Sequence, residues 1–170
     1  NDFPPGSPTH DQVPYAFKPF AIQAARDAGY TKILWMDSKC YILSQVTPIE
    51  EALEKDGYWF VEDGMTVGEW CKDSSLPLLD ITREEGFKMP VITAKYFALN
   101  FEHKIARDFF DAYMGYAVDN DGEAYIGPWT NENGQASTDE RVRGHRHDQV
   151  CGSVVLHKLG MKLSPNNVVD

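Results

Sequence analysis

The sequence has few cysteines, and nothing suggests that they pair. Cys40, Cys71 and Cys151 lie far apart, without the Cys-x-x-Cys spacing of a thiolate zinc site. Three cysteines at this spacing give no disulfide framework either. We therefore expect a protein of a reducing compartment, the cytoplasm.

Long apolar runs and an excess of basic residues are also lacking. No stretch of the 170 residues reaches the roughly 20 apolar residues of a membrane-spanning helix, and no signal-peptide pattern follows Asn1. The chain has 26 Asp and Glu but only 16 Lys and Arg, which gives a formal net charge of −10. Because binding along a nucleic acid needs an extended basic face, we expect neither a nucleic-acid partner nor a membrane span.

The sequence does contain enough apolar material for a single domain over residues 1–170, because 42% of its residues are hydrophobic and 12% are aromatic. Residues 1–13 form a proline-rich irregular lead-in. Helical spacing and capping patterns predict helices over residues 15–28, 47–57, 82–85, 103–116 and 148–159. Apolar runs predict strands over residues 32–37, 58–61 and 91–101, and residues 119–143 are predicted to form a long loop.

Strands that alternate with helices predict an α/β sandwich with a largely parallel sheet. In such sheets ligands bind beyond the carboxyl ends of the strands, where Asp37 and the Glu62-Asp63 pair stand in this sequence. The alternative for Asp37 is a plain turn residue, because Asp-Ser is a common way to leave a strand.

Residues 141–149, Arg-Val-Arg-Gly-His-Arg-His-Asp-Gln, reverse the charge of the acidic chain locally. The segment leads into a predicted amphipathic helix, whose N-terminal end carries a partial positive charge. We interpret it as a place where an anion, a metal or a reacting group binds. The alternative is a solvated loop.

Four segments together resemble a poorly characterised group of bacterial and viral glycosyltransferase-like proteins. They are Val13-Pro-Tyr-Ala-Phe-Lys-Pro19, Lys32-Ile-Leu-Trp-Met-Asp-Ser38, Met89-Pro90, and Gly144-His-Arg-His-Asp-Gln149 ahead of a helix ending in Lys-Leu-Gly-Met161. The resemblance implies a GT-A-type fold (nucleotide-diphospho-sugar transferase), a three-layer sandwich with a mostly parallel mixed sheet. It further implies a hexosyltransferase that takes a nucleotide-sugar donor and a carbohydrate or other hydroxyl acceptor, and for a viral source it implies the host cytoplasm.

Two features depart from that group of enzymes. GT-A enzymes commonly carry an Asp-x-Asp motif that holds a divalent cation, whereas this chain has Asp37-Ser38-Lys39. Losing one carboxylate weakens a Mn²⁺ or Mg²⁺ site, while Lys39 can itself neutralise a phosphate. In addition, nothing before Tyr15 resembles the first base-binding βα unit of that fold.

The resemblance and the chemistry of the residues together assign candidate roles. Asp148, at the start of a predicted helix, is the candidate catalytic carboxylate that accepts a proton from the acceptor hydroxyl, and its alternative role is an N-cap. The candidate ligands of Mn²⁺ or Mg²⁺ are Asp37, His145 and His147, and the alternative for the two histidines is an ordinary surface position. The donor and its phosphates are assigned to Lys18, Asp37, Lys39, Arg146 and Gln149. The acceptor wall is assigned to Asp63, Trp70 and Trp129, and the loop over residues 119–143 is expected to close over the donor.

The sequence is therefore compatible with three functions. The first is a glycosyltransferase, and the second is a non-catalytic relative that keeps the fold as a sugar-binding or assembly module. A metal-dependent hydrolase built on the His-x-His-Asp cluster ranks lower, because no further histidine or paired-carboxylate motif accompanies it.

Overall fold

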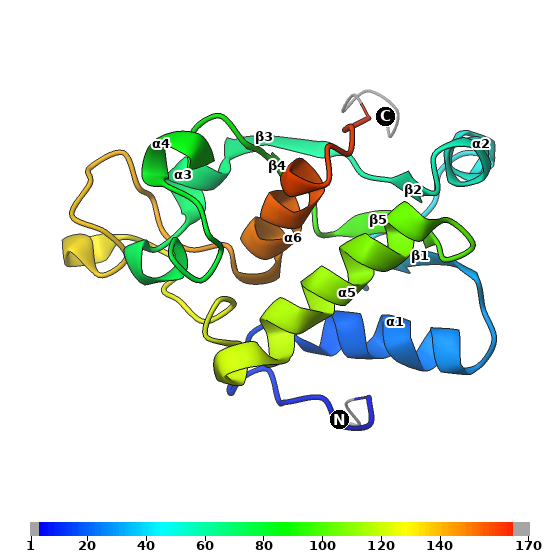
Figure 1. The fold of residues 1–170 in the computed structure, drawn as a ribbon, viewed down its shortest axis with the longest axis horizontal. Helices are drawn as coiled ribbons and strands as arrows, with labels where there is room; N and C mark the ends of the chain where they lie inside the picture. Colours follow the sequence, from blue (N-terminus) through cyan, green and yellow to red (C-terminus); the bar gives the residue numbers. More distant parts are fainter. Residues whose placement is uncertain (1–3, 165–170) are drawn as a thin grey trace.

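The computed structural model describes residues 4–164, which form a mixed α/β structure (Figure 1). The α-helices are α1 (Phe17–Asp27), α2 (Thr47–Lys55), α3 (Val67–Trp70), α4 (Arg83–Gly86), α5 (Lys104–Val118) and α6 (His147–Lys158). The strands are β1 (Lys32–Met36), β2 (Tyr58–Trp59), β3 (Glu62–Thr66), β4 (Pro90–Ile92) and β5 (Tyr96–Asn100). Short 3-10 turns are η1 (Asp73–Ser75), η2 (Asp119–Gly122) and η3 (Glu132–Gly134).

The main sheet has the order β1-β5-β2, and both outer strands run antiparallel to β5. Ala98 of β5 pairs with Leu34 on one side and with Trp59 on the other. The α/β class is therefore confirmed, but the prediction of a mostly parallel sheet is wrong. Strands that alternate with helices were expected to pair in parallel with the next strand along the chain. Instead, β5 lies between β1 and β2 and pairs antiparallel with each of them.

Successive side chains along a strand point to opposite faces of the sheet, and in β5 both faces are apolar. Helices therefore cover both faces of this sheet. Phe97 and Leu99 face the large core beneath α1, α5 and α6, while Ala98 faces the smaller cluster formed with Leu53 of α2. Figure 1 shows α5 crossing between α1 and α6, with α2 at the other side of the sheet. The antiparallel pairing leaves the carboxyl end of β1 beside the start of β5.

Helix α6 is buried on nearly all sides rather than amphipathic as predicted. Its residues from His147 to Leu156 are buried, apart from a half-buried Gln149, because α5, β4 and α3 each pack against it. The stretch predicted as one strand over residues 91–101 is two strands, since residues 93–95 break it. β4 pairs instead with β3 in a second, two-stranded sheet.

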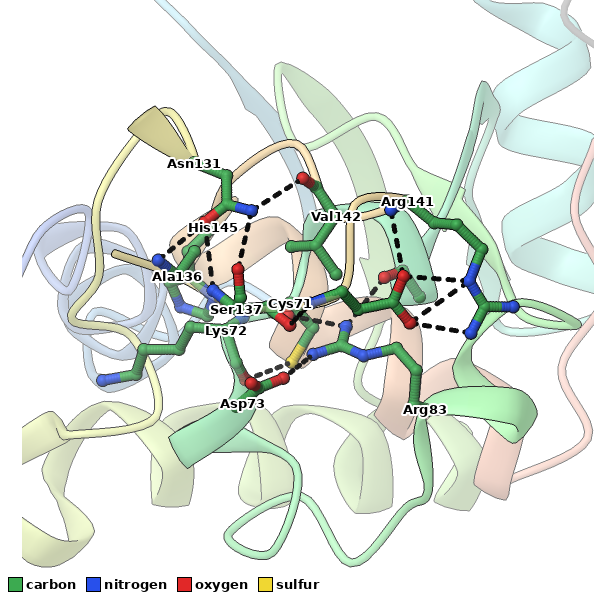
Figure 2. A network of polar contacts seen from close by, with 12 residues as sticks. Cys71, Lys72, Asp73, Arg83, Asn131, Ala136, Ser137, Arg141, Val142 and His145 are labelled. Atoms are coloured by element: carbon green, nitrogen blue, oxygen red, sulfur yellow. Dashed lines mark hydrogen bonds and ion pairs between the residues drawn. The ribbon is translucent and has the colours of Figure 1, made fainter. Parts of the chain in front are cut away.

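The long loop over residues 119–143 is fastened to the domain (Figure 2). The amide of Asn131 donates to the carbonyls of Ser137 and Val142 at 2.9 and 3.0 Å and accepts from the backbone of Ala136 and Ser137 at 2.9 and 3.0 Å. Near the C-terminal end of the loop, Arg141 forms ion pairs with Asp139 and with Glu84 of α4. These bonds therefore connect parts of the loop to one another and attach it to α4.

No helix within residues 4–164 is long and apolar enough to cross a membrane.

Candidate functional site

A pocket of about 400 Å³ opens where the carboxyl end of β1 meets α1 and the start of α6. We call it the central pocket. It gathers most of the residues that sequence reasoning singled out, from segments far apart in the chain. Its lining consists of Tyr15, Lys18, Asp37, Asp63, Met65, Ala94, Lys95, Trp129, Arg146, Asp148 and Gln149.

Lys18 enters the pocket from the first turn of α1. Pro19 is tolerated beside it because the first turn needs no backbone N–H donor. Lys18 and Ile22, one helical turn apart, face inward, so that the Lys18 side chain is only 3% exposed. Its ammonium donates to the carbonyl of Ala94 at 2.8 Å.

Two carboxylates flank the Lys18 ammonium. Asp148 Oδ2 lies 3.0 Å from Lys18 Nζ, and Asp37 Oδ1 lies 3.4 Å from it. Asp37 directly follows β1, so its side chain shares a face with Trp35, whose indole N–H donates to Asp37 Oδ1 at 3.0 Å. The Asp37 side chain is 33% exposed and the Asp148 side chain 5%, so Asp37 is the more accessible of the two to a ligand.

Asp148 is held from a second side by α5, where the Tyr113 hydroxyl donates to Asp148 Oδ2 at 3.2 Å. Burial raises the pKa of Asp148, and the neighbouring Lys18 ammonium acts against that rise. Burial also raises the pKa of Tyr113 well above its usual range, which keeps the hydroxyl protonated as a donor. A shielded carboxylate of this kind binds a proton more readily than an exposed one.

Arg146 presents a cation at the rim of the pocket. Its guanidinium lies 3.9 Å from the ring centre of Trp70 and 4.8 Å from that of Trp129. Such stacking positions a planar cation and leaves its edges for a ligand. Arg146 Nε is buried without a hydrogen-bond partner among residues 4–164.

Gln149 and Asp63 also line the central pocket. The Gln149 amide donates at 2.7 Å to Asp63 Oδ2 and at 2.7 Å to the carbonyl of Ile92. This pair places a carboxylate and an amide side by side, which is the combination that hydroxyl-rich ligands use.

The backbone is strained beside the pocket. Six residues other than glycine have positive φ within the described chain: Tyr15, Asp80, Asn120, Asp121, Asn133 and His147. Asp, Asn and His, including His147 (φ 40°), adopt that conformation more often than other residues, whereas the bulky Tyr15 (φ 64°) rarely does. These two rings lie 5.5 Å apart, and both contact Trp129. Strain of this kind is held in place by its surroundings and concentrates at functional sites.

Tyr15 and Trp129 form an aromatic wall of the central pocket. His145 and His147 lie behind this wall and do not line the pocket. His145 Nδ1 accepts from the backbone N–H of Lys72 at 3.3 Å, and Nε2 contacts the carbonyl of Ala124 at 3.0 Å, so both ring nitrogens are in use. His147 Nδ1 donates to the carbonyl of Tyr125 at 2.8 Å, because a carbonyl can only accept. Its Nε2 is buried without a partner in the described chain. Burial lowers the pKa of both histidines, that of His145 to about 3.

The structure does not gather Asp37, His145 and His147 into one group of metal ligands within residues 4–164. Within residues 4–164 no three His, Cys, Asp or Glu side chains are grouped so that they could hold a metal. Of the predicted set, Asp37 lines the central pocket beside the Lys18 ammonium, both ring nitrogens of His145 are engaged, and His147 keeps Nε2 without a partner in the described chain.

Two further predicted residues lie elsewhere. Lys39 is exposed and lines a different, more apolar pocket of about 270 Å³ between residues 39–49 and the sheet. Trp70 does not line the central pocket but supports Arg146 from behind. Sequence reasoning missed Tyr15 and Lys95 of the lining, and it missed Tyr113. Tyr15 could have been found from its place three residues before Lys18 in the Val13–Pro19 segment.

Comparison with known proteins gave no match to a family model, to a curated protein or to a solved structure.

Proposed function

We propose that the central pocket binds a nucleotide-sugar donor and that the protein is a glycosyltransferase, moving the sugar to a hydroxyl acceptor. One observation carries the proposal. Asp37 and Asp148, from distant parts of the chain, meet at one lysine in a pocket walled by Tyr15 and Trp129. Aromatic faces stack on sugar rings, and carboxylates accept hydrogen bonds from sugar hydroxyls.

The charges of the pocket support the same chemistry. In the transfer, the bond between the anomeric carbon and the phosphate oxygen breaks, and its electron pair leaves with the diphosphate. Arg146, at the start of α6, is the cation placed to receive that negative charge. The acceptor oxygen forms the new bond to the anomeric carbon, and its proton passes to the Asp148 carboxylate.

A second candidate, the non-catalytic sugar-binding module, is favoured by two contacts of one carboxylate oxygen. Lys18 and Tyr113 both already engage Asp148 Oδ2, and both act against the rise that burial gives the pKa of Asp148. Binding without turnover would then be the function of the same pocket.

Release of free sugar from a panel of nucleotide sugars tests the proposal. We expect at least one donor to be hydrolysed slowly without an acceptor, and Asp148→Asn to lower the rate by at least about 100-fold, the usual contribution of a general base. The control is Asp80→Asn, at an exposed carboxylate whose ion pair within residues 4–164 is with Lys158. It should keep the wild-type rate, and both variants should remain folded.

Each result decides between the candidates. Binding of a nucleotide sugar without release would support the non-catalytic module, whereas neither binding nor release would reject both. Full activity of Asp148→Asn would remove Asp148 from the mechanism.

A further inference from the structure

Lys18 sits at a point that oxygen ligands surround. Its Nζ lies 2.8 Å from the Ala94 carbonyl, 3.0 Å from Asp148 Oδ2 and 3.4 Å from Asp37 Oδ1. An ammonium group has three N–H donors, and here three oxygens from three separate segments face it. The Tyr15 ring centre, 5.0 Å away, and the Trp35 ring centre, 5.8 Å away, enclose the group further.

The same three oxygens are the kind of ligand that a divalent cation would select. Mg²⁺ and Mn²⁺ prefer carboxylate and carbonyl oxygens. A buried ammonium at this point excludes such an ion, both by filling the space and by repelling its charge. The Lys18 side chain is only 3% exposed and extends from the first turn of α1.

We propose that the Lys18 ammonium takes the place of a divalent cation between Asp37 and Asp148, so that this site works without a metal. The sequence suggested a substituting cation at Lys39, but that residue lines the other pocket. Lys18 is a positioning residue in this proposal, because it fixes both carboxylates. The claim that catalysis proceeds without a metal rests on the proposed function. The claim that Lys18 keeps a divalent cation out of this site does not depend on that function.

The charge balance of the site changes accordingly. One ammonium leaves a net single negative charge on the two carboxylates, whereas a divalent ion would neutralise both. The ammonium, held by its three oxygens, is not free to bridge a diphosphate as a metal does. Arg146, whose side chain has no ion pair within residues 4–164, is then the cation that meets the phosphates.

Mn²⁺ binding followed by electron paramagnetic resonance tests the proposal without any nucleotide sugar. We expect wild-type protein to show no Mn²⁺ site that depends on Asp37. Lys18→Ala should empty the centre of the three oxygens and bind Mn²⁺ at least about tenfold more tightly than wild type. The added substitution Asp37→Asn should remove the new site. Lys95→Ala, at an exposed lysine of the same pocket, is the matched control and should gain no site.

Two results would overturn the proposal. One is a Mn²⁺ site in wild-type protein that Asp37→Asn abolishes. The other is a folded Lys18→Ala variant that binds Mn²⁺ no more tightly than wild type. If Lys18→Ala does not fold, Lys18→Gln takes its place, and the wild-type titration still decides. Failure of the sugar-release test would leave these measurements unaffected.

Discussion

At the scale of single residues, His145 and His147 show how two histidines in one segment take different roles. The ring of His145 is closed in by two backbone hydrogen bonds and by the backbone of Gly127, where an added Cβ would lie 2.6 Å from it. His147 instead packs against Tyr15 and Trp129, with ring centres 5.5 and 4.7 Å away, and so supports the aromatic wall. Neither position resembles the surface loop that was the alternative from the sequence.

The buried His145 gives a pH prediction. Burial lowers its pKa to about 3, whereas the unfolded chain keeps about 6.5. Between these values only the unfolded chain binds the proton, so the free energy of unfolding falls as the pH falls below about 6.5, by about 1.4 kcal/mol per unit from this residue. From pH 7 to pH 5 the loss should be about 2 kcal/mol.

Urea unfolding of wild type and His145→Gln at pH 7 and pH 5 measures this loss. The variant should be less stable at pH 7, because two hydrogen bonds are disturbed, yet lose less on acidification. Other titrating groups are common to both proteins and cancel in the difference. Equal losses in the two proteins would show that His145 does not carry the effect.

At the scale of elements, most of the helices were predictable because their signals are local, whereas α3 was not predicted although Thr66 and Glu69 form a capping box at its start. The helix predicted over residues 15–28 is α1, which ends before Gly29, and the Thr47-Pro48 start of α2 follows the preference for proline in the first turn. Strand direction depends instead on which distant strands pair. Residues 93–95 contain neither glycine nor proline, so no local signal divided β4 from β5.

The loop over residues 119–143 yields a prediction about Asn131. Its side chain makes four hydrogen bonds within the loop, so Asn131→Ala should lower the free energy of unfolding by about 3 kcal/mol. Gln135→Ala, which removes one exposed bond to the Thr130 carbonyl, should cost under about 1 kcal/mol. Urea unfolding gives both values. Similar costs for the two variants would mean that the loop is not fastened through Asn131.

At the scale of the whole molecule, the central pocket is a product of long-range assembly. Topology predicted that Asp37 and Asp63 would stand at the site, the resemblance and the residue chemistry added Asp148, and all three line this pocket. The two carboxylates meet although the predicted strand direction is wrong, because Asp37 after β1 and Asp148 of α6 both contact Lys18 of α1. The position of Lys18 between the carboxylates could not be foreseen, since it depends on how α1 packs on the sheet.

The four tryptophans report on the two pockets separately. Trp129 lines the central pocket. The Trp35 indole N–H donates a hydrogen bond to Asp37, which also lines this pocket. Trp70 stacks on Arg146, whereas Trp59 lines the apolar pocket that includes Lys39. Each indole N–H gives its own signal in a ¹H–¹⁵N spectrum, so a bound ligand can be located without a crystal.

Titration of ¹⁵N-labelled protein with a panel of nucleotide sugars, followed through these indole signals, tests the central claim most directly. We predict that at least one compound shifts the Trp129 and Trp35 signals in a saturable way and leaves Trp59 unchanged. If no nucleotide sugar moves Trp129 or Trp35, or if only Trp59 responds, the central pocket is not a nucleotide-sugar site.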